Sequence, residues 1–227
     1  MLRLVAIVAS LVALCQGVFQ HSLLLDEQSL RAGHHCHDHC NETQIAGCGE
    51  TFLSSLNFTV TGDVFKILAE FGQLMTTVEG FESLCKANYD LAKCLNWKGE
   101  FCIHDIHFLE KQLGLDRDNA TLLLTLIRQI DFFCEPEHFK VLDDNYYCII
   151  NTSISHSEEL AKCGQEFADR SQKHPRLTCF YATQYIGCVS EPYRRECGGK
   201  VGKVVCENSK LNFEEFVPYC RHRLFCF

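Results

Sequence analysis

The sequence lacks the short motifs by which many enzymes are recognised. It contains no G-x-S-x-G, no H-E-x-x-H, no P-loop and no dinucleotide-binding fingerprint. It also lacks a surplus of positive charge, since 21 Lys+Arg stand against 29 Asp+Glu, a formal net charge of -8. That balance removes the usual electrostatic basis for binding nucleic acid or anionic lipid. We therefore predict a non-enzymatic protein that needs no cofactor and binds no nucleic acid.

Proline is also scarce, with four in the chain and none before Pro136. This scarcity favours helices over many short strands joined by turns. The 47% of hydrophobic residues argues against disorder. Helical i, i+3, i+4 spacing of apolar residues runs through residues 45–56, 64–78 and 122–130, the last opened by the cap-type residues Asp118 and Asn119.

Two more helices are predicted in the second half of the chain. One begins at Ser157, and another covers residues 181–189 and stops before or at Gly198-Gly199. Residues 141–150 are ambiguous, because their tyrosines and isoleucines favour a strand while Asp143-Asp144-Asn145 resembles a turn. The 17 phenylalanines are expected to fill the core.

The N-terminus has the pattern of a secretory signal peptide over residues 1–17. Arg3 supplies a positive charge, Leu4 to Leu14 is apolar, and small residues precede a cleavage site after Gly17. The apolar run spans about 16 Å as a helix, too short for a bilayer core of about 30 Å. We predict a secreted, extracellular protein without a membrane span.

Four Asn-x-Ser/Thr sequons follow the predicted signal peptide. A lone sequon arises easily by chance, but four in a secreted chain predict N-glycosylation at one or more of them, and hence exposure. The acceptors are Asn41, Asn57, Asn119 and Asn151.

After an exposed, His-rich lead-in of residues 18–39, no linker interrupts residues 40–227, which we expect to form one compact, all-α domain.

Cysteine is abundant, with 16 residues of which Cys15 lies in the predicted signal peptide. No C-x-x-C occurs, which removes the commonest redox dithiol and the commonest zinc knuckle. Spacings of eight or nine residues recur, and such residues lie about 12–14 Å apart along one helix. A disulfide needs Cα atoms within about 7 Å, so each cysteine must reach a neighbouring segment. The fourteen predicted to form disulfides are Cys40, Cys48, Cys85, Cys94, Cys102, Cys134, Cys148, Cys163, Cys179, Cys188, Cys197, Cys206, Cys220 and Cys226.

Residues 85–102 and 179–197 share a loose C-x8-C-x7/8-C frame with tyrosines inside. Two explanations are open at this level. The frame reflects an internal duplication, or it results from cross-linking helices of similar length.

The cysteine pattern also resembles a known family, the nematode secreted cysteine-rich domain catalogued as domain of unknown function nineteen. The resemblance covers roughly residues 40–220 and rests on cysteine spacing with a few flanking residues. The matching segments are Cys40-x7-Cys48, Phe81 to Cys85, Cys94-Leu95, Cys102, Cys179-Phe180-Tyr181, Cys188-Val189, Glu196-Cys197-Gly198, Val204-Val205-Cys206 and Tyr219-Cys220. It implies a helical, disulfide-bonded extracellular domain and carries over no catalytic residues.

Cys36 is then the odd cysteine of the secreted chain. Four explanations are open at this level. Cys36 pairs within the fold and another cysteine is free, or a cysteine is capped by a small thiol. Alternatively, Cys36 links two chains as a dimer or joins a metal site. The metal hypothesis arises because imidazole and thiolate ligands suit zinc or copper. The candidate ligands are His34, His35, Cys36, His37 and His39.

A second His/Asp cluster, His104-Asp105 with His107, follows Cys102. Exposed polar residues after a disulfide explain it most simply.

Taken together, the sequence favours a secreted, non-enzymatic binding or structural module with an unidentified extracellular ligand or protein partner. The alternatives are a secreted hydrolase with an unrecognised site and an extracellular metal-binding protein.

Overall fold

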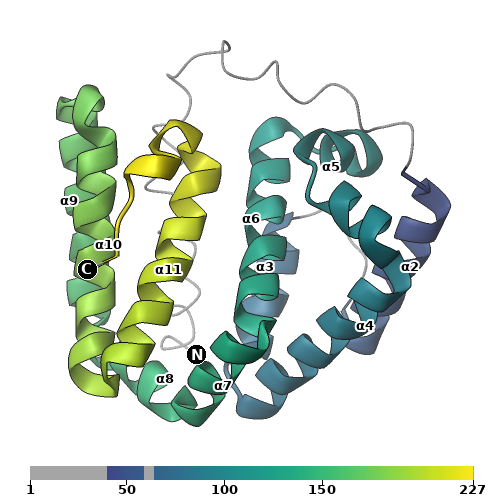
Figure 1. Cartoon of the computed structure of the whole chain (residues 1–227), viewed down its shortest axis with the longest axis horizontal. Helices are drawn as coiled ribbons and strands as arrows, with labels where there is room; N and C mark the ends of the chain where they lie inside the picture. The colour runs from purple at the N-terminus through teal and green to yellow at the C-terminus, as the bar shows by residue number, and fades with distance from the viewer. Residues whose placement is uncertain (1–39, 59–63, 227) are drawn as a thin grey trace. The chain divides into compact units, whose positions relative to one another are not determined.

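The computed structural model describes residues 40–58 and 64–226. The predicted signal peptide (1–17) and His-rich lead-in (18–39) lie outside these residues. Within them no strand occurs, and the prediction of an all-α fold cross-linked by disulfides is confirmed (Figure 1). The helices are α2 (Glu42–Ser55), α3 (Val64–Leu74), α4 (Val78–Ile103), α5 (Ile106–Leu113), α6 (Arg117–Cys134), α7 (Pro136–Asp144), α8 (Tyr146–Ser155), α9 (Ser157–Lys173), α10 (Thr178–Cys197) and α11 (Gly199–Phe216), with the 3-10 helices η3 (Pro175–Leu177) and η4 (Pro218–Arg223).

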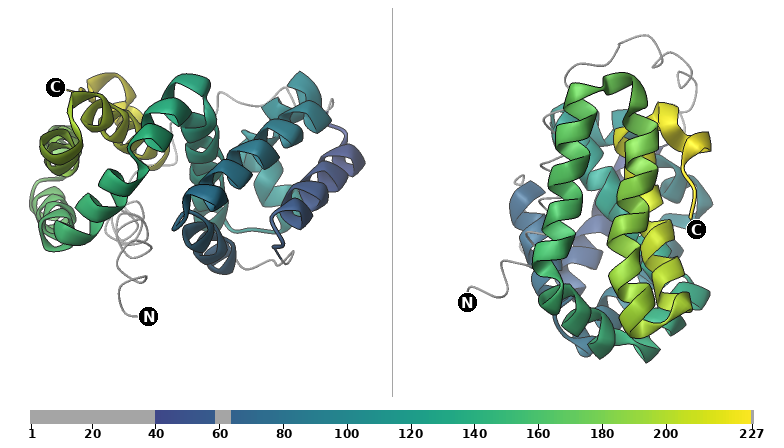
Figure 2. Two further views of the ribbon diagram at one scale, coloured as in Figure 1. Left: turned by 90° about the horizontal axis from the view of Figure 1, so that it is seen from below. Right: turned by 90° about the vertical axis from the view of Figure 1, so that its left-hand side faces the viewer.

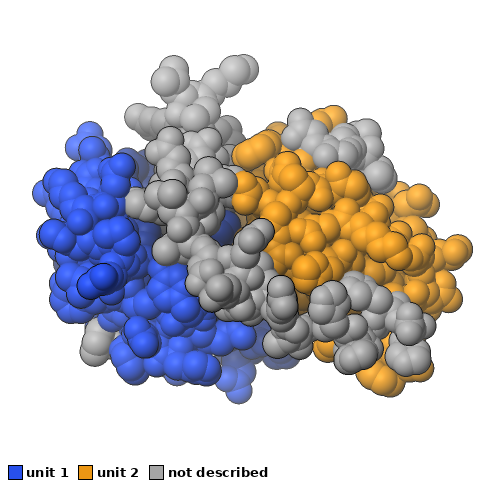
Figure 3. Space-filling model, turned by 90° about the horizontal axis from the view of Figure 1, so that it is seen from above, with its two compact units in different colours: residues 1–24, 135–227 blue, residues 25–134 orange. Residues whose placement is uncertain are grey.

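The helices group into two compact units rather than around a single core (Figure 3). Among the described residues, unit 2 holds 40–134 and unit 1 holds 135–226. The boundary has no linker: α6 ends at Cys134, and Glu135 directly precedes α7. A boundary without a change in composition leaves no mark in the sequence, which is why the sequence predicts one domain.

Unit 2 is organised around α4, which packs against α2 and α6, while α5 packs against α6. Its apolar residues form two clusters. One is built around Phe71, Leu84 and Ile130, and the other around Phe108 and Leu124. Burial of these stripes, rather than helix propensity alone, stabilises helices of this length.

Unit 1 is organised around α10, which packs against α8, α9 and α11. α9 and α10 lie side by side and are joined at one end (Figure 2, right). The core contains three aromatic rings in edge or tilted contact. The ring centroids of Phe167 and Phe213 are 4.9 Å apart, and those of Tyr185 and Phe213 are 5.2 Å apart, separations typical of favourable aromatic pairs.

Two of the predicted helix limits hold and one fails. α9 begins at Ser157 as expected, and α10 ends at Cys197, directly before Gly198, whose φ of 93° suits glycine. The stripe at 122–130 lies in α6, but its cap is Asp116, which accepts a hydrogen bond from the backbone N–H of Asn119 at 2.8 Å. Because α6 starts at Arg117, Asp118 and Asn119 are inside its first turn rather than before it.

The segment 141–150 is helical on both sides of Asn145. The strand suggested by Tyr146, Tyr147, Ile149 and Ile150 is wrong, since all four lie in α8. Packing overrides β-propensity here because Tyr146 is 7% exposed in the helical conformation. The turn is reduced to Asn145, whose side-chain amide donates to the carbonyl of Val141 at 2.8 Å.

Seven disulfides use all fourteen cysteines of residues 40–226, so the predicted set is confirmed. Every bridge joins different segments, with Cα–Cα distances of 5.0–6.0 Å. Those of unit 2 are Cys40–Cys102, Cys48–Cys94 and Cys85–Cys134. Those of unit 1 are Cys148–Cys197, Cys163–Cys188, Cys179–Cys220 and Cys206–Cys226.

The two units share one bridge order. In each, a central helix carries three cysteines, namely α4 in unit 2 and α10 in unit 1. The third is bridged to the first cysteine of the unit, the second to the second, and the first to a cysteine that follows the helix. Only Cys206–Cys226 has no counterpart in the described residues of unit 2. Similar helix lengths explain the spacing but not the shared order, so the bridges favour duplication.

Candidate functional site

The predicted metal ligands His34, His35, Cys36, His37 and His39 all lie outside the described residues. Within residues 40–58 and 64–226, no three His, Cys, Asp or Glu side chains come together as a metal site requires. Cys40, at the end of the same tract, is bridged to Cys102 and is not a thiol ligand. The metal hypothesis therefore stays a prediction for the lead-in.

The three residues of the second His/Asp cluster have separate roles. Asp105 caps α5 by accepting from the backbone N–H of His107 at 2.9 Å. Nε2 of His104 lies 2.7 Å from Oδ2 of Asp131 in α6, whose other oxygen accepts from Asn88 at 2.9 Å. The His107 side chain instead contacts Glu110. The sequence neighbours therefore form no single site, although His104–Asp131 is an ordered acid–base pair that the sequence did not predict.

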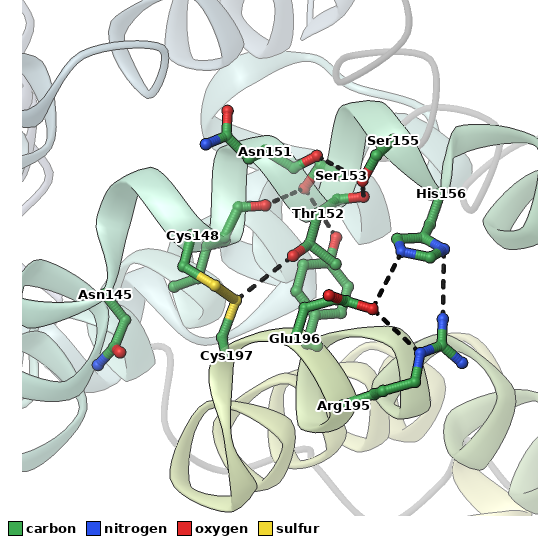
Figure 4. The surroundings of a disulfide bond; sticks show 12 residues. Asn145, Cys148, Asn151, Thr152, Ser153, Ser155, His156, Arg195, Glu196 and Cys197 are labelled. Atoms are coloured by element: carbon green, nitrogen blue, oxygen red, sulfur yellow. Dashed lines mark hydrogen bonds and ion pairs between the residues drawn. A yellow bond between two sulfur atoms is a disulfide. The ribbon is translucent and has the colours of Figure 1, made fainter.

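A second polar cluster surrounds the Cys148–Cys197 bridge of unit 1 (Figure 4). His156, between α8 and α9, has Nδ1 2.9 Å from Glu159 and Nε2 3.6 Å from Glu196. Arg195, near the end of α10, contacts Glu196 at 3.1 Å and Glu159 at 3.6 Å. The hydrogen bond with Glu196 raises the pKa of the Arg195 guanidinium. These contacts, with the disulfide, tie α8 and α9 to α10.

Hydroxyl groups drawn in Figure 4 also have interaction partners. Ser153 Oγ donates to the carbonyl of Ile149 and lies 2.8 Å from the hydroxyl of Tyr193. Thr152 Oγ1 lies 3.4 Å from Sγ of Cys197. Burial raises the pKa of Tyr193. Among the described residues, no hydrogen bond joins Thr152 or Ser153 to His156, which is the contact that a nucleophile and its base would make.

The predicted glycosylation acceptors differ in exposure. Asn41, Asn57 and Asn151 are exposed, whereas Asn119 is half-buried in the first turn of α6. The Asn119 side-chain amide donates to Asp116 at 2.9 Å. The first three therefore offer more accessible acceptors in the folded chain.

The most unusual exposed feature of unit 2 is the chain's single tryptophan. Trp97 is 74% exposed, and Phe101, four residues later, is 57% exposed. Residues i and i+4 of a helix share one face, so the two rings lie on the same side of the second half of α4. The prediction that the phenylalanines fill the core fails at Phe101, and also at Phe65, Phe180 and Phe225, which are all more than half exposed.

A break in α4 directly precedes Trp97. Asn96 has φ 54° and ψ 177°, a conformation that favours glycine. Its side chain accepts from the backbone N–H of Lys98 at 3.0 Å and so caps the second half of the helix. The carbonyl of Cys94 instead accepts from the side-chain amide of Gln44 in α2 at 2.9 Å. Backbone polar groups on both sides of the kink thus have hydrogen-bond partners.

Two disulfides hold the exposed rings in place. Cys94, three residues before Trp97, is bridged to Cys48 of α2, and Cys102, directly after Phe101, is bridged to Cys40. Gly99 leaves room beneath the kink for Leu95, which is 1% exposed, since a Cβ at Gly99 would lie 3.0 Å from that of Leu95. We call Trp97 and Phe101 the α4 aromatic face. Sequence reasoning missed it because a kink with positive φ at asparagine leaves only a weak local signal.

No family model, curated protein or solved structure matches this chain. In residues 40–58 and 64–226, no helix is both long and apolar enough to cross a bilayer. The seven disulfides are consistent with an extracellular protein.

Proposed function

We propose that the protein is a secreted, non-enzymatic binding module that recognises an extracellular partner through the α4 aromatic face. The observation that supports this is the 74% exposure of Trp97 beside a kinked, disulfide-held backbone. Large exposed aromatic side chains are costly to leave in water and are enriched among the residues that dominate protein interfaces.

Rigidity supports the same proposal. Ordering a mobile side chain on binding costs about 0.5–1.5 kcal/mol, and ordering a mobile backbone segment adds to this cost. A surface whose backbone is already fixed avoids much of the second cost. Here the Cys48–Cys94 and Cys40–Cys102 bridges flank the rings, and the Gln44–Cys94 hydrogen bond fixes the kink. A non-glycine residue held at positive φ costs about 1–3 kcal/mol, and such strain is concentrated at functional sites.

The remaining parts of the proposal concern processing and family. Removal of residues 1–17, N-glycosylation at Asn41, Asn57 or Asn151, and membership of the cysteine-rich family named above all accord with a disulfide-rich extracellular chain. They rest on sequence patterns, and mass spectrometry of the secreted protein tests the first two directly.

The binding proposal is tested through Trp97 itself, which is the only tryptophan and therefore the only source of tryptophan emission. The full secreted chain is screened against arrays of extracellular proteins and glycans. A true ligand shifts the emission of Trp97 to shorter wavelength and protects it from acrylamide. Trp97→Ala weakens binding by at least about tenfold, whereas Tyr147→Ala, which removes a ring 73% exposed in unit 1, leaves affinity unchanged.

Two results would contradict the proposal. A ligand that binds wild type and Trp97→Ala equally would place recognition elsewhere. Hydrolase activity that survives Trp97→Ala but is lost in His104→Gln would favour the enzyme alternative, with the His104–Asp131 pair as its acid–base group.

A further inference from the structure

One end of unit 1 gathers exposed apolar and basic side chains. Leu177 is 48% exposed, Phe180 58% and Tyr219 49%. They come from η3, the start of α10 and η4. The connection between α9 and α10 and the helix η4, which is yellow, lie at the same end of this unit (Figures 1 and 2). Lys173, Arg176 and Arg223 are exposed at the same end. We call these six residues the basic aromatic end.

Three connections tie the segments of this end together. The Cys179–Cys220 bridge, with a Cα–Cα distance of 5.2 Å, joins the residue before Phe180 to the residue after Tyr219. Leu177 ends η3 and directly precedes α10, so it lies three residues before Phe180 in the chain. The hydroxyl of Thr183, three residues further on, donates to the carbonyl of Arg223 at 3.3 Å. The backbone that carries Phe180, Tyr219 and Arg223 is therefore held by the bridge and the hydrogen bond.

Among the described residues, the cations of this end differ from most charged residues of unit 1 in their partners. Most charged residues of unit 1 pair with one another, as Arg221 does with Glu214 and Glu215 at 3.9 and 3.8 Å. In the described part of the chain, by contrast, Lys173, Arg176 and Arg223 contact no carboxylate within 4.0 Å. Within the described residues, this end thus combines three cations without an ion pair and three exposed apolar side chains.

The net charge of -8 opposes an anionic partner at long range. At physiological ionic strength, however, charges more than about 8 Å apart are largely screened, so contact depends on the local charges. Protein surfaces that lie at a bilayer interface combine exposed leucine and aromatic side chains with Arg and Lys. The apolar groups lie among the acyl chains and the cations lie at the headgroups.

We propose that the basic aromatic end is a peripheral docking site for a bilayer that contains anionic phospholipid. Phe180 and Leu177 enter the headgroup boundary, Tyr219 lies at the level of the headgroups, and Arg176, Arg223 and Lys173 contact lipid phosphates and carboxylates. The inference is independent of the α4 aromatic face, which belongs to unit 2.

The test is flotation of the full secreted chain with vesicles of phosphatidylcholine alone or mixed with phosphatidylserine. The wild type floats with the mixed vesicles and not with phosphatidylcholine alone. Arg176→Gln and Arg223→Gln each weaken partitioning by about fivefold. Phe180→Ala weakens it by about tenfold or more, since a phenyl ring leaves the interface.

Two matched control variants test whether binding depends on where a side chain lies in unit 1 or only on its type. Lys200→Gln removes another exposed cation of unit 1 with no ion pair among the described residues, and Tyr147→Ala removes an equally exposed ring on α8. Both leave partitioning unchanged. The proposal is overturned if the wild type does not float with mixed vesicles, if the controls lose binding equally, or if heparin is bound while vesicles are not, which would identify a site for a sulfated polymer.

Discussion

The side chain of Asn96 accepts a hydrogen bond from the backbone N–H of Lys98 at 3.0 Å, while Asn96 itself is held at φ 54°. One residue thus caps the second half of α4 and carries the strain of breaking it. The opposing effects make substitutions here informative.

Asn96→Ala is expected to destabilise unit 2 by about 1–2 kcal/mol, because it removes the cap and keeps the strain. Asn96→Gly loses the same cap but relieves the strain, so its stability stays within about 1 kcal/mol of wild type. Urea unfolding followed by Trp97 emission measures both. Equal destabilisation by Ala and Gly would show that φ at this position is not strained.

Two glycines test the packing of the helices against each other. A Cβ at Gly80 would lie 2.0 Å from the carbonyl oxygen of Leu74, so Gly80→Ala must move backbone and is expected to cost more than about 2 kcal/mol. A Cβ at Gly164, inside α9, would meet no described atom within 4 Å. Gly164→Ala should therefore be neutral or stabilise by up to about 1 kcal/mol through helix propensity. Thermal unfolding by circular dichroism compares the pair, and a reversed order would contradict the packing.

Tyr193 predicts a loss of stability at alkaline pH. Burial raises its pKa above the ordinary value, and the hydrogen bond with Ser153 opposes this to a smaller extent. Below the unfolded-state pKa, Tyr193 makes its full contribution to the stability of the folded state. As pH rises through the folded-state pKa, the unfolded chain gives up its proton more readily and stability falls.

The measurement is urea unfolding between about pH 9 and pH 11, with Cys36→Ser in all proteins so that no thiolate promotes disulfide exchange. Tyr193→Phe is less stable at neutral pH by about 1 kcal/mol, because it loses the hydrogen bond to Ser153. Its stability should fall less steeply with pH than that of the parent. Parallel slopes in the two proteins would exclude Tyr193 as the cause.

Much of the architecture could be predicted because it depends on local patterns. The cysteine spacing required bridges between segments, and apolar periodicity located α2, α3 and α6. The α8 helix could not be predicted, because burial of Tyr146 outweighs β-propensity. The exposed surfaces were also missed, since composition does not show which aromatic residues the packing leaves outside.

The candidate sites divide along the same line. The His34–His39 tract was visible as composition, but the His104–Asp131 pair joins residues from two segments far apart in the sequence and needs the fold. Likewise the basic aromatic end depends on the Cys179–Cys220 bridge, which spacing alone does not identify.

Reduction should loosen both units. A typical bridge contributes about 2–4 kcal/mol, and several in one unit do not simply add. Unit 2 holds three bridges and unit 1 four. In reductant, helical circular dichroism should fall and proteolysis should accelerate at sites in both units. Retention of full helicity and protease resistance would mean that the cores alone stabilise the fold.

Both exposed surfaces depend on the bridge framework that holds them, and disulfide mapping of the non-reduced protein by mass spectrometry tests that framework most directly. The predicted result is peptides joining Cys40 to Cys102, Cys48 to Cys94, Cys85 to Cys134, Cys148 to Cys197, Cys163 to Cys188, Cys179 to Cys220 and Cys206 to Cys226, with Cys36 in none of them. A peptide joining a cysteine of residues 40–134 to one of residues 135–226, or Cys36 to any of these fourteen, would contradict it.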